Sequence, residues 1–243
     1  MISFFSKLNQ SNKPASFQHV EVDIHAHWLP GVDDGADSLE TSIALIRGLL
    51  ELGFRKLIAT PHIMLEHYPN QPKKLRQVFQ ATSDYIRSQG INVELELAAE
   101  YMLDEGFLDQ LDSRDVLSIG DRYLLVEFPI HKPFPLAGKF IERILESGYT
   151  PVLAHPERYS YYRRDIATFK ELINQGALLQ LNLLSLSGHY GKEVANWGRH
   201  LLEDRLYHFV GSDLHRASQL ADYRVDLSHH QFLNAELMQT IGS

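Results

Sequence analysis

Two pairs of polar side chains in this chain have a spacing that suits metal binding. His25 and His27 stand two positions apart, and Asp213 and His215 repeat that spacing near the other end of the sequence. In an extended strand, side chains at positions i and i+2 point to the same side. Imidazole and carboxylate groups placed in this way can hold one divalent ion together. We therefore predict that both pairs contribute to a metal site.

Further candidate ligands lie between these pairs, directly after a predicted strand or in the loop that adjoins one. They are Asp34 (or its neighbour Asp33), His62, Glu100 and His155. With the two pairs they make five histidines and three carboxylates, which is too many for a single tetrahedral ion. Such a set suits two or three ions that share a carboxylate.

Each of these residues also has an ordinary structural explanation. Asp34 suits a turn or a helix N-cap, and Asp213 suits the cap of a following helix. A single His-x-His sequence is a weak signal by itself. The ordinary explanations do not account for the whole set, because every member falls at the same end of successive predicted strands.

Segments with strand and helix patterns alternate along the chain. Short apolar strands between amphipathic helices indicate βα units around a parallel sheet, and about seven units favour a closed barrel over an open sheet. In such a barrel the carboxyl ends of the strands converge on one face, where active sites lie. The expected strands are 21–25, 56–60, 92–98, 123–126, 151–154, 178–181 and 207–210, and the expected helices are 37–52, 73–88, 137–147, 166–175 and 192–203.

The length of 243 residues favours one domain, because single α/β barrels commonly run to about 250 residues. Residues 1–17 are rich in Ser, Asn, Lys and Gln, so we expect a flexible leader there and a single domain over 18–243. The beginning of the chain lacks the apolar core of a secretory signal, and no apolar run approaches the ~18 residues of a membrane span. We therefore expect a cytoplasmic protein with no membrane insertion.

The composition narrows the chemistry. The chain has 13 histidines and no cysteine, which excludes disulfides, thiolate metal sites and cysteine nucleophiles. Its 23 basic and 31 acidic residues give a net charge of −8, which disfavours nucleic acid as a partner. The histidines that lack a place at a strand end are expected to be solvated or hydrogen-bonded: His19, His67, His131, His189, His200, His208, His229 and His230.

Taken in order, the motifs resemble the PHP (polymerase and histidinol phosphatase) superfamily. The segments 33–35 and 155–158 resemble more narrowly its bacterial capsule-locus protein-tyrosine phosphatases. The resemblance covers residues 21–216 and implies a distorted (β/α)7 TIM-like barrel with two or three divalent ions, most often manganese. Ligands without thiolate also admit Fe, Zn or Ni. The motifs are His25-Ala26-His27, the loop 29–35, Thr60-Pro61-His62, Ala99-Glu100-Tyr101, Ala154-His155-Pro156-Glu157-Arg158 and Gly211-Ser212-Asp213-Leu214-His215.

The resemblance also assigns roles to individual residues, with Asp33 left open as an alternative to Asp34. Arg158 matches the family arginine that holds the substrate phosphate. The usual position of a second phosphate-binding arginine is not arginine here, so Arg216 or Arg224 would have to replace it. The implied ligands are His25, His27, Glu100 and Asp213 around one ion, Glu100 and His155 at a second, and Asp34, His62 and His215 at the third.

The activity implied by the resemblance is phosphotyrosine hydrolysis, with a bacterial tyrosine autokinase of capsular and exopolysaccharide synthesis as the phosphoprotein partner. A hydroxide that bridges two ions would attack phosphorus, while the ions and Arg158 hold the phosphoryl oxygens. We expect catalysis to depend on Arg158, Asp213 and His215. The easily displaced phenol reduces the need for a general acid, and the sequence leaves its identity open between a metal-bound water and His215, the latter only if it is free of metal.

Two other functions remain open at the level of sequence. One is another PHP phosphoesterase, such as a histidinol phosphatase, which would turn over histidinol phosphate faster than phosphotyrosine. The other is a catalytically weak, metal-stabilised module that binds the kinase, which would hold metal without turnover. The departure at the second arginine is the observation that supports the latter.

Overall fold

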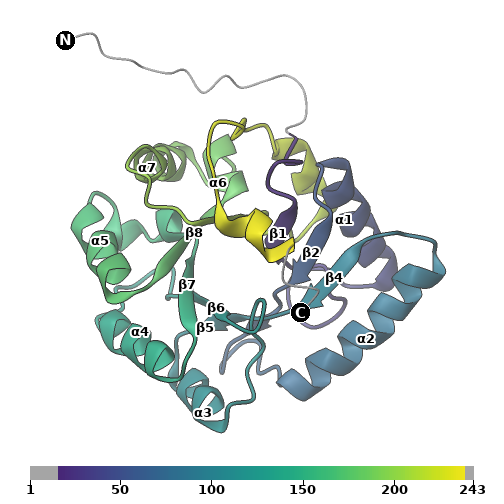
Figure 1. Ribbon diagram of the computed structural model, residues 1–243, viewed down its shortest axis with the longest axis horizontal. Coiled ribbons are helices and arrows are strands. Elements are labelled where there is room, and N and C mark those ends of the chain that lie inside the picture. Colours follow the sequence, from purple (N-terminus) through teal and green to yellow (C-terminus); the bar gives the residue numbers. More distant parts are fainter. Residues whose placement is uncertain (1–15, 239–243) are drawn as a thin grey trace.

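The computed structural model describes residues 16–238 and has an α/β fold with parallel strands, which confirms the predicted class. The strands lie in the middle of the molecule, and the helices lie around them (Figure 1). Within the described residues the strands form two sheets, with the orders β1-β2-β4 and β3-β5-β6-β7-β8-β9. The strands are β1 (Val22–Ala26), β2 (Lys56–Ala59), β3 (His62–Ile63), β4 (Glu94–Leu97), β5 (Glu100–Met102), β6 (Tyr123–Glu127), β7 (Thr150–Ala154), β8 (Leu178–Asn182) and β9 (Phe209–Gly211).

Two longer strand paths are each interrupted, so that β2 continues as β3 and β4 continues as β5. Only Thr60 and Pro61 separate β2 from β3. The strand is interrupted there because proline has no N–H to donate to a neighbouring strand. Parallel pairing continues across the break, since the Ala98 N–H donates to Ala59 O (2.8 Å) and the Glu100 N–H donates to Pro61 O (3.1 Å). The two sheets therefore meet along β2–β3 and β4–β5.

The first and last strands are also linked. The His27 N–H donates to Leu214 O (3.0 Å), and the Asp213 N–H donates to His25 O (2.7 Å). These bonds bring the pair His25 and His27 close to the pair Asp213 and His215, although most of the chain lies between them in sequence. The parallel path thus returns from β9 to β1.

The helices follow the predicted pattern closely where they are long. Ser38 caps α1 by accepting from the Thr41 N–H, and Gly176 ends α5 in the left-handed conformation that favours glycine. Two shorter helices, α3 and α6, were not expected from periodicity. The helices are α1 (Leu39–Glu51), α2 (Pro72–Ser88), α3 (Glu105–Ser113), α4 (Ala137–Glu146), α5 (Ile166–Gln175), α6 (Leu183–Ser187) and α7 (Lys192–Glu203), with 3₁₀ turns η1 (Pro156–Arg158), η2 (Ser160–Tyr162), η3 (Ala217–Asp222) and η4 (Leu233–Met238).

The boundary of the expected leader needs one correction. Residues 1–15 lie outside the described residues, but Phe17, placed in the leader by its polar neighbours, is fully buried. Its ring stacks on Phe54 (5.4 Å between centroids) and meets the edge of Tyr223. The packed part of the chain therefore begins no later than Phe17. Among the described residues, no helix is long and apolar enough to cross a membrane.

Candidate active site

The residues predicted to bind metal come together at the carboxyl ends of the strand paths. His25 belongs to β1, Glu100 begins β5, and His62 begins β3, whose register pairs it directly with Glu100. The backbone lies close to His25 as well, since a Cβ at position 211 would stand 2.5 Å from the His25 Cβ, which explains a glycine there. The convergence expected from the strand pattern is thus present in the structure.

Glu100 occupies the centre of the cluster and is fully buried. Its Oε2 lies 3.1 Å from His25 Nε2, 3.4 Å from His27 Nε2 and 3.1 Å from His62 Nδ1. Its Oε1 lies 2.9 Å from His155 Nε2. One carboxylate therefore faces four imidazoles, which is the arrangement expected of a carboxylate shared between ions.

Asp213 uses its two carboxylate oxygens on two different sides. Oδ1 faces the histidines, 3.3 Å from His25 Nε2 and 3.5 Å from His27 Nε2. Oδ2 accepts hydrogen bonds from Arg158 Nη1 (2.9 Å) and Asn182 Nδ2 (2.5 Å). One oxygen is thus directed toward a metal position and the other toward the predicted phosphate-binding arginine.

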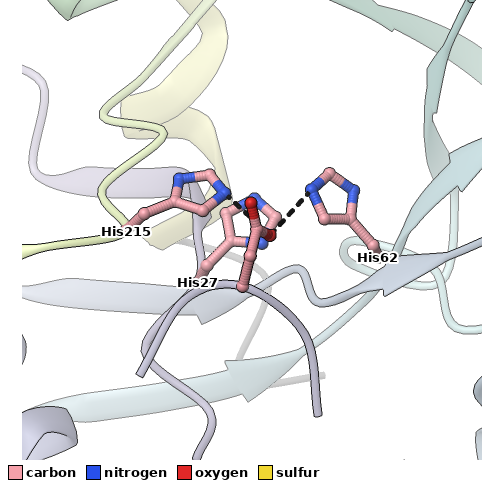
Figure 2. Close-up of side chains that lie close together, drawn as sticks. His27, His62 and His215 are labelled. Atoms are coloured by element: carbon pink, nitrogen blue, oxygen red, sulfur yellow. Dashed lines mark ion pairs between the residues drawn. The ribbon is translucent and has the colours of Figure 1, made fainter. Parts of the chain in front are cut away.

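A third group forms around Asp34. Its Oδ1 lies 3.6 Å from His62 Nε2 and 3.5 Å from His215 Nε2. Figure 2 shows these two rings with His27 close by. Asp33 has a different place, because its Oδ2 lies 2.8 Å from His27 Nδ1 and also accepts from the His62 N–H. The geometry therefore favours Asp34 as the ligand and Asp33 as the group that orients His27.

Glu127 is a member of the site that sequence reasoning missed. It ends β6, and its side chain is buried with Oε1 3.3 Å from His62 Nδ1 and Oε2 3.8 Å from His155 Nε2. The signal was available, because Glu127 directly follows the predicted strand 123–126, as the other candidates follow theirs. We add Glu127 to the candidate ligands.

Divalent cations fit this donor set. Buried lone-pair atoms at its centre, Glu100 Oε2 and Glu127 Oε1, have no hydrogen-bond partner among the described residues. Buried polar atoms without partners are rare and call for an ion or water. The groups able to hold an ion are His27 with Asp34, His62 and His215; His25 with Glu100 and His155; His25 and His27 with Asp213; and His62 with Glu100 and Glu127.

Outer contacts fix the orientation of the two first histidines. His25 Nδ1 lies 2.9 Å from Gln180 Oε1, and His27 Nδ1 lies 2.8 Å from Asp33 Oδ2. Both contacts turn the Nε2 atoms toward Glu100 and Asp213, as acceptors behind metal-binding imidazoles commonly do. The backbone is also strained here, since His155 has φ 35° and Asp213 has φ 53°.

The charges of the cluster stabilise one another. Burial lowers the pKa of His62, but the Glu100 and Glu127 carboxylates together outweigh it and raise that pKa to about 10. Burial likewise opposes the charge on Glu100, yet His25 and His62 hold the pKa of this carboxyl well below its usual range. Without ions the raised pKa values of His25, His27 and His62 favour their protonated forms, which neutralise the buried carboxylates.

We expect binding of divalent ions to release protons, because an ion and a proton compete for the same imidazole nitrogen. The raised pKa of His62 extends this competition from pH 6.5 to about 10, so metal affinity should increase with pH across that range. Calorimetric titration with Mn²⁺ in buffers of different ionisation enthalpy measures the protons released. A binding enthalpy independent of the buffer would contradict this prediction.

The surroundings of Arg158 suit a phosphate-binding role. Besides its bond to Asp213, its guanidinium lies over the Tyr190 ring, with Cζ 4.4 Å from the centroid. The other expected arginine, Arg216, is exposed and makes no ion pair within residues 16–238. Arg224 donates from Nε to the nearby Ala221 O. Neither of these two arginines is held against the cluster as Arg158 is.

The cation–π contact makes a prediction about Tyr190. Because it holds the guanidinium beside the site, Tyr190→Leu should raise KM for p-nitrophenyl phosphate about threefold to tenfold with little change in kcat. Tyr190→Phe keeps the ring and should stay close to the unmodified protein. The effect should disappear when Arg158 is already alanine, and an equal effect in that background would show that Tyr190 acts otherwise.

Comparisons with known proteins identify relatives of this chain. A sequence model of the family described as "Capsular polysaccharide synthesis, CpsB/CapC" matches residues 21–223. The tyrosine-protein phosphatase YwqE of Bacillus subtilis is 33% identical over 195 residues, which are 80% of this chain and 77% of that protein. The tyrosine-protein phosphatase CpsB of Streptococcus pneumoniae is 29% identical over 208 residues, or 83% of this chain and 86% of the relative.

Solved structures extend the likeness to three dimensions. A crystal structure from work on YwqE of Bacillus subtilis and CpsB of Streptococcus pneumoniae, described as unique metal-dependent tyrosine phosphatases, has a TM-score of 0.76 and 30% identity, and the match covers 90% of this chain and 85% of that one. An amidohydrolase from Mycoplasma synoviae has a TM-score of 0.52 at 13% identity, covering 96% and 88% of the two chains, which is a likeness of fold alone.

Proposed function

This chain belongs to the CpsB/CapC family of capsular polysaccharide synthesis, and we propose that it is a metal-dependent protein-tyrosine phosphatase. The observation that carries this proposal is Glu100, a buried carboxylate within 3.4 Å of four histidines and beside an arginine-bound aspartate. The fold that positions them we infer to be one distorted (β/α)7 barrel of the PHP type, formed by a single domain. Its seven strand paths are the nine strands with β2–β3 and β4–β5 each counted once.

Nine side chains would hold the ions. When bound, two or three divalent ions lower the pKa of water and withdraw charge from phosphoryl oxygens. Manganese is the ion we propose, with Fe, Zn or Ni as alternatives that the same ligands accept. The proposed ligands are His25, His27, Asp34, His62, Glu100, Glu127, His155, Asp213 and His215.

The chain itself supplies orientation and charge. Arg158 has donors available for the phosphate oxygens, and their charge would stabilise the growing negative charge in the transition state. Asp213 keeps Arg158 in place through Oδ2 while its Oδ1 faces the histidines. His215 donates from Nδ1 to the Asp213 carbonyl (3.0 Å), which leaves Nε2 toward Asp34 and favours His215 as a ligand over a general acid.

A phenolate leaving group fits a site without a strong general acid. The tyrosine hydroxyl has a pKa of about 10, so its anion leaves far more easily than that of an alkyl alcohol. We propose that the phosphoprotein is a tyrosine autokinase that regulates polysaccharide synthesis. The location of this chain in the cytoplasm stays a prediction from sequence. Any contribution of Arg216 to phosphate binding also stays a prediction.

The function is tested by assaying the purified protein on p-nitrophenyl phosphate, a phosphotyrosine peptide and histidinol phosphate. We expect turnover of the first two that needs Mn²⁺ and is abolished by a chelator. Faster hydrolysis of histidinol phosphate would instead assign the protein to another kind of phosphoesterase. Metal binding with no turnover of any substrate would leave only a kinase-binding role.

A further inference from the structure

One pocket outside the metal cluster has a lining rich in hydrogen-bond donors. It has a volume of about 420 Å³ and lies between the end of η2 and the face of α7. Figure 1 shows α7 on the side of the molecule opposite α2. The lining residues are Arg163, Arg164, Glu193, Asn196, Trp197 and His200.

Two of these residues have buried N–H groups that lack an acceptor. Arg163 Nε and Trp197 Nε1 are both buried, and neither has a hydrogen-bond partner in the described part of the chain. Trp197 as a whole is only 6% exposed. Buried donors are normally paired, because leaving them unpaired costs their full desolvation energy. Two of the lining residues thus carry a donor with no acceptor in the described part of the chain.

The charges also favour an acceptor with negative charge. Arg164 is exposed and forms no ion pair with any residue between 16 and 238, and its φ of 71° holds it in the left-handed region. Arg163 already takes a carboxylate, because its Nη1 pairs with Glu193 Oε2. The Glu193 side chain is 77% exposed, and such surface pairs are weak, so a carboxylate from another molecule can replace it.

The pocket is joined to the active site by two parallel contacts. Arg158 lies over Tyr190 at the active site, and Arg163 pairs with Glu193 at the pocket, so the same two segments run side by side between them. The segment from Arg158 to Arg163 contains two short 3₁₀ turns, which are separated at Tyr159 by an extended residue. Five residues of chain span at most about 18 Å, and an extended peptide covers that distance in about five residues.

We propose that this pocket binds an oxyanion of the phosphoprotein substrate, and that this oxyanion is an acidic side chain within about five residues of the phosphotyrosine. The proposal rests on the proposed phosphatase function and adds a preference for sequence around the phosphorylated residue. Glu193 holds the place of that side chain in the free protein. Glu193 therefore competes with the acidic side chain of the substrate, whereas Arg163 and Arg164 attract that side chain.

The test compares phosphotyrosine peptides that differ only by Glu or Gln placed at one of the five positions before or after the phosphotyrosine. We expect the best-placed Glu to raise kcat/KM about threefold to tenfold over Gln. A phosphoserine at the same place distinguishes a phosphate from a carboxylate as the preferred oxyanion. Equal kcat/KM for the Glu, Gln and phosphoserine peptides at every position would overturn the proposal.

Variants of the pocket should change the preference for Glu over Gln in opposite directions, which distinguishes the pocket from a general effect of charge. Arg164→Gln should abolish the preference for Glu, whereas Glu193→Gln should increase it by removing the competing carboxylate. Arg87→Gln is the matched control, since it also removes a positive charge from an exposed side chain, but on α2. If Arg87→Gln weakens the preference as much as Arg164→Gln does, the pocket is not the site.

Failure of this inference is separable from failure of the proposed function. The substrate p-nitrophenyl phosphate is too small to reach the pocket, so its turnover should be the same in the three variants and the unmodified protein. Turnover of that substrate without any preference among peptides would reject only the pocket. Absence of metal-dependent turnover on every substrate would reject the phosphatase function itself.

Discussion

Glu100→Gln is expected to abolish metal-dependent phosphatase activity, lowering kcat on p-nitrophenyl phosphate roughly a hundredfold or more, since loss of outer contacts alone commonly costs about 10- to 100-fold. The substitution keeps the size of the side chain but removes its charge. The glutamate oxygens lie within 3.4 Å of His25, His27, His62 and His155, so one change affects each group that would share it. Elemental analysis of the purified variant should show less bound metal.

The control for this prediction is Glu96→Gln. Glu96 precedes Glu100 on the same strand path but points elsewhere, pairing with Lys56 Nζ at 2.8 Å and accepting from the Gly120 N–H. It should keep both metal and activity, and circular dichroism checks that each variant is folded. Full metal content in Glu100→Gln, with kcat within tenfold of the unmodified protein, would contradict the central role of this carboxylate.

The fold was predictable where local pattern and tertiary structure agree. Helix α7 (Lys192–Glu203) has the expected bounds, and α2 begins one residue early because Pro72 suits the first helical position. Helix α3 was missed because Gly106 weakens the pattern in its first turn, although Asp104 caps it. The sequence predicted that the second strand ends before Pro61, whereas in the structure the strand path continues at His62. That continuation depends on pairing with Glu100, which has no local signal.

The site was predictable to the extent that chain position determines it. Placement after predicted strands identified the ligand candidates that the structure brings together. The same criterion applied to Glu127, which directly follows the predicted strand 123–126 and is the last residue of β6 in the structure. The choice between Asp33 and Asp34 could not be made from sequence, because neighbouring residues in a loop point in directions that only the folded backbone determines. The contacts of Gln180 and Asn182 have no local signal at all, since each depends on a residue from a distant strand.

The same limit applies to the role of Arg158. The His-Pro-Glu-Arg segment resembles a family motif, but the reason for an arginine at its end lies in three dimensions. Glu157 is buried and accepts from the Asn182 N–H (3.0 Å), while the Asn182 side chain donates to Asp213 and Asp213 holds Arg158. Residues in η1, at the end of β8 and just after β9 thus fix one guanidinium, which is more preorganised than an arginine on a free loop.

Because of this preorganisation, Arg158→Ala is expected to lower kcat/KM for phosphotyrosine substrates about 100- to 1,000-fold, the usual cost of losing one donor to a developing oxyanion. Metal content should stay unchanged, because Asp213 keeps Oδ1 toward His25 and His27 and retains the Asn182 bond on Oδ2. This separates Arg158→Ala from Glu100→Gln, which should lose metal as well.

Two further variants show what the guanidinium contributes. Arg158→Lys keeps the charge without the planar pair of donors, so its kcat/KM should lie between those of alanine and the unmodified protein. Arg216→Ala should lose much less, because the Arg216 side chain is exposed and makes no ion pair within residues 16–238. Steady-state kinetics of all three variants at saturating Mn²⁺ decides the matter. A kcat/KM of Arg158→Ala within threefold of the unmodified protein would show that the arginine is peripheral, and a larger loss in Arg216→Ala would assign the phosphate contact to Arg216 instead.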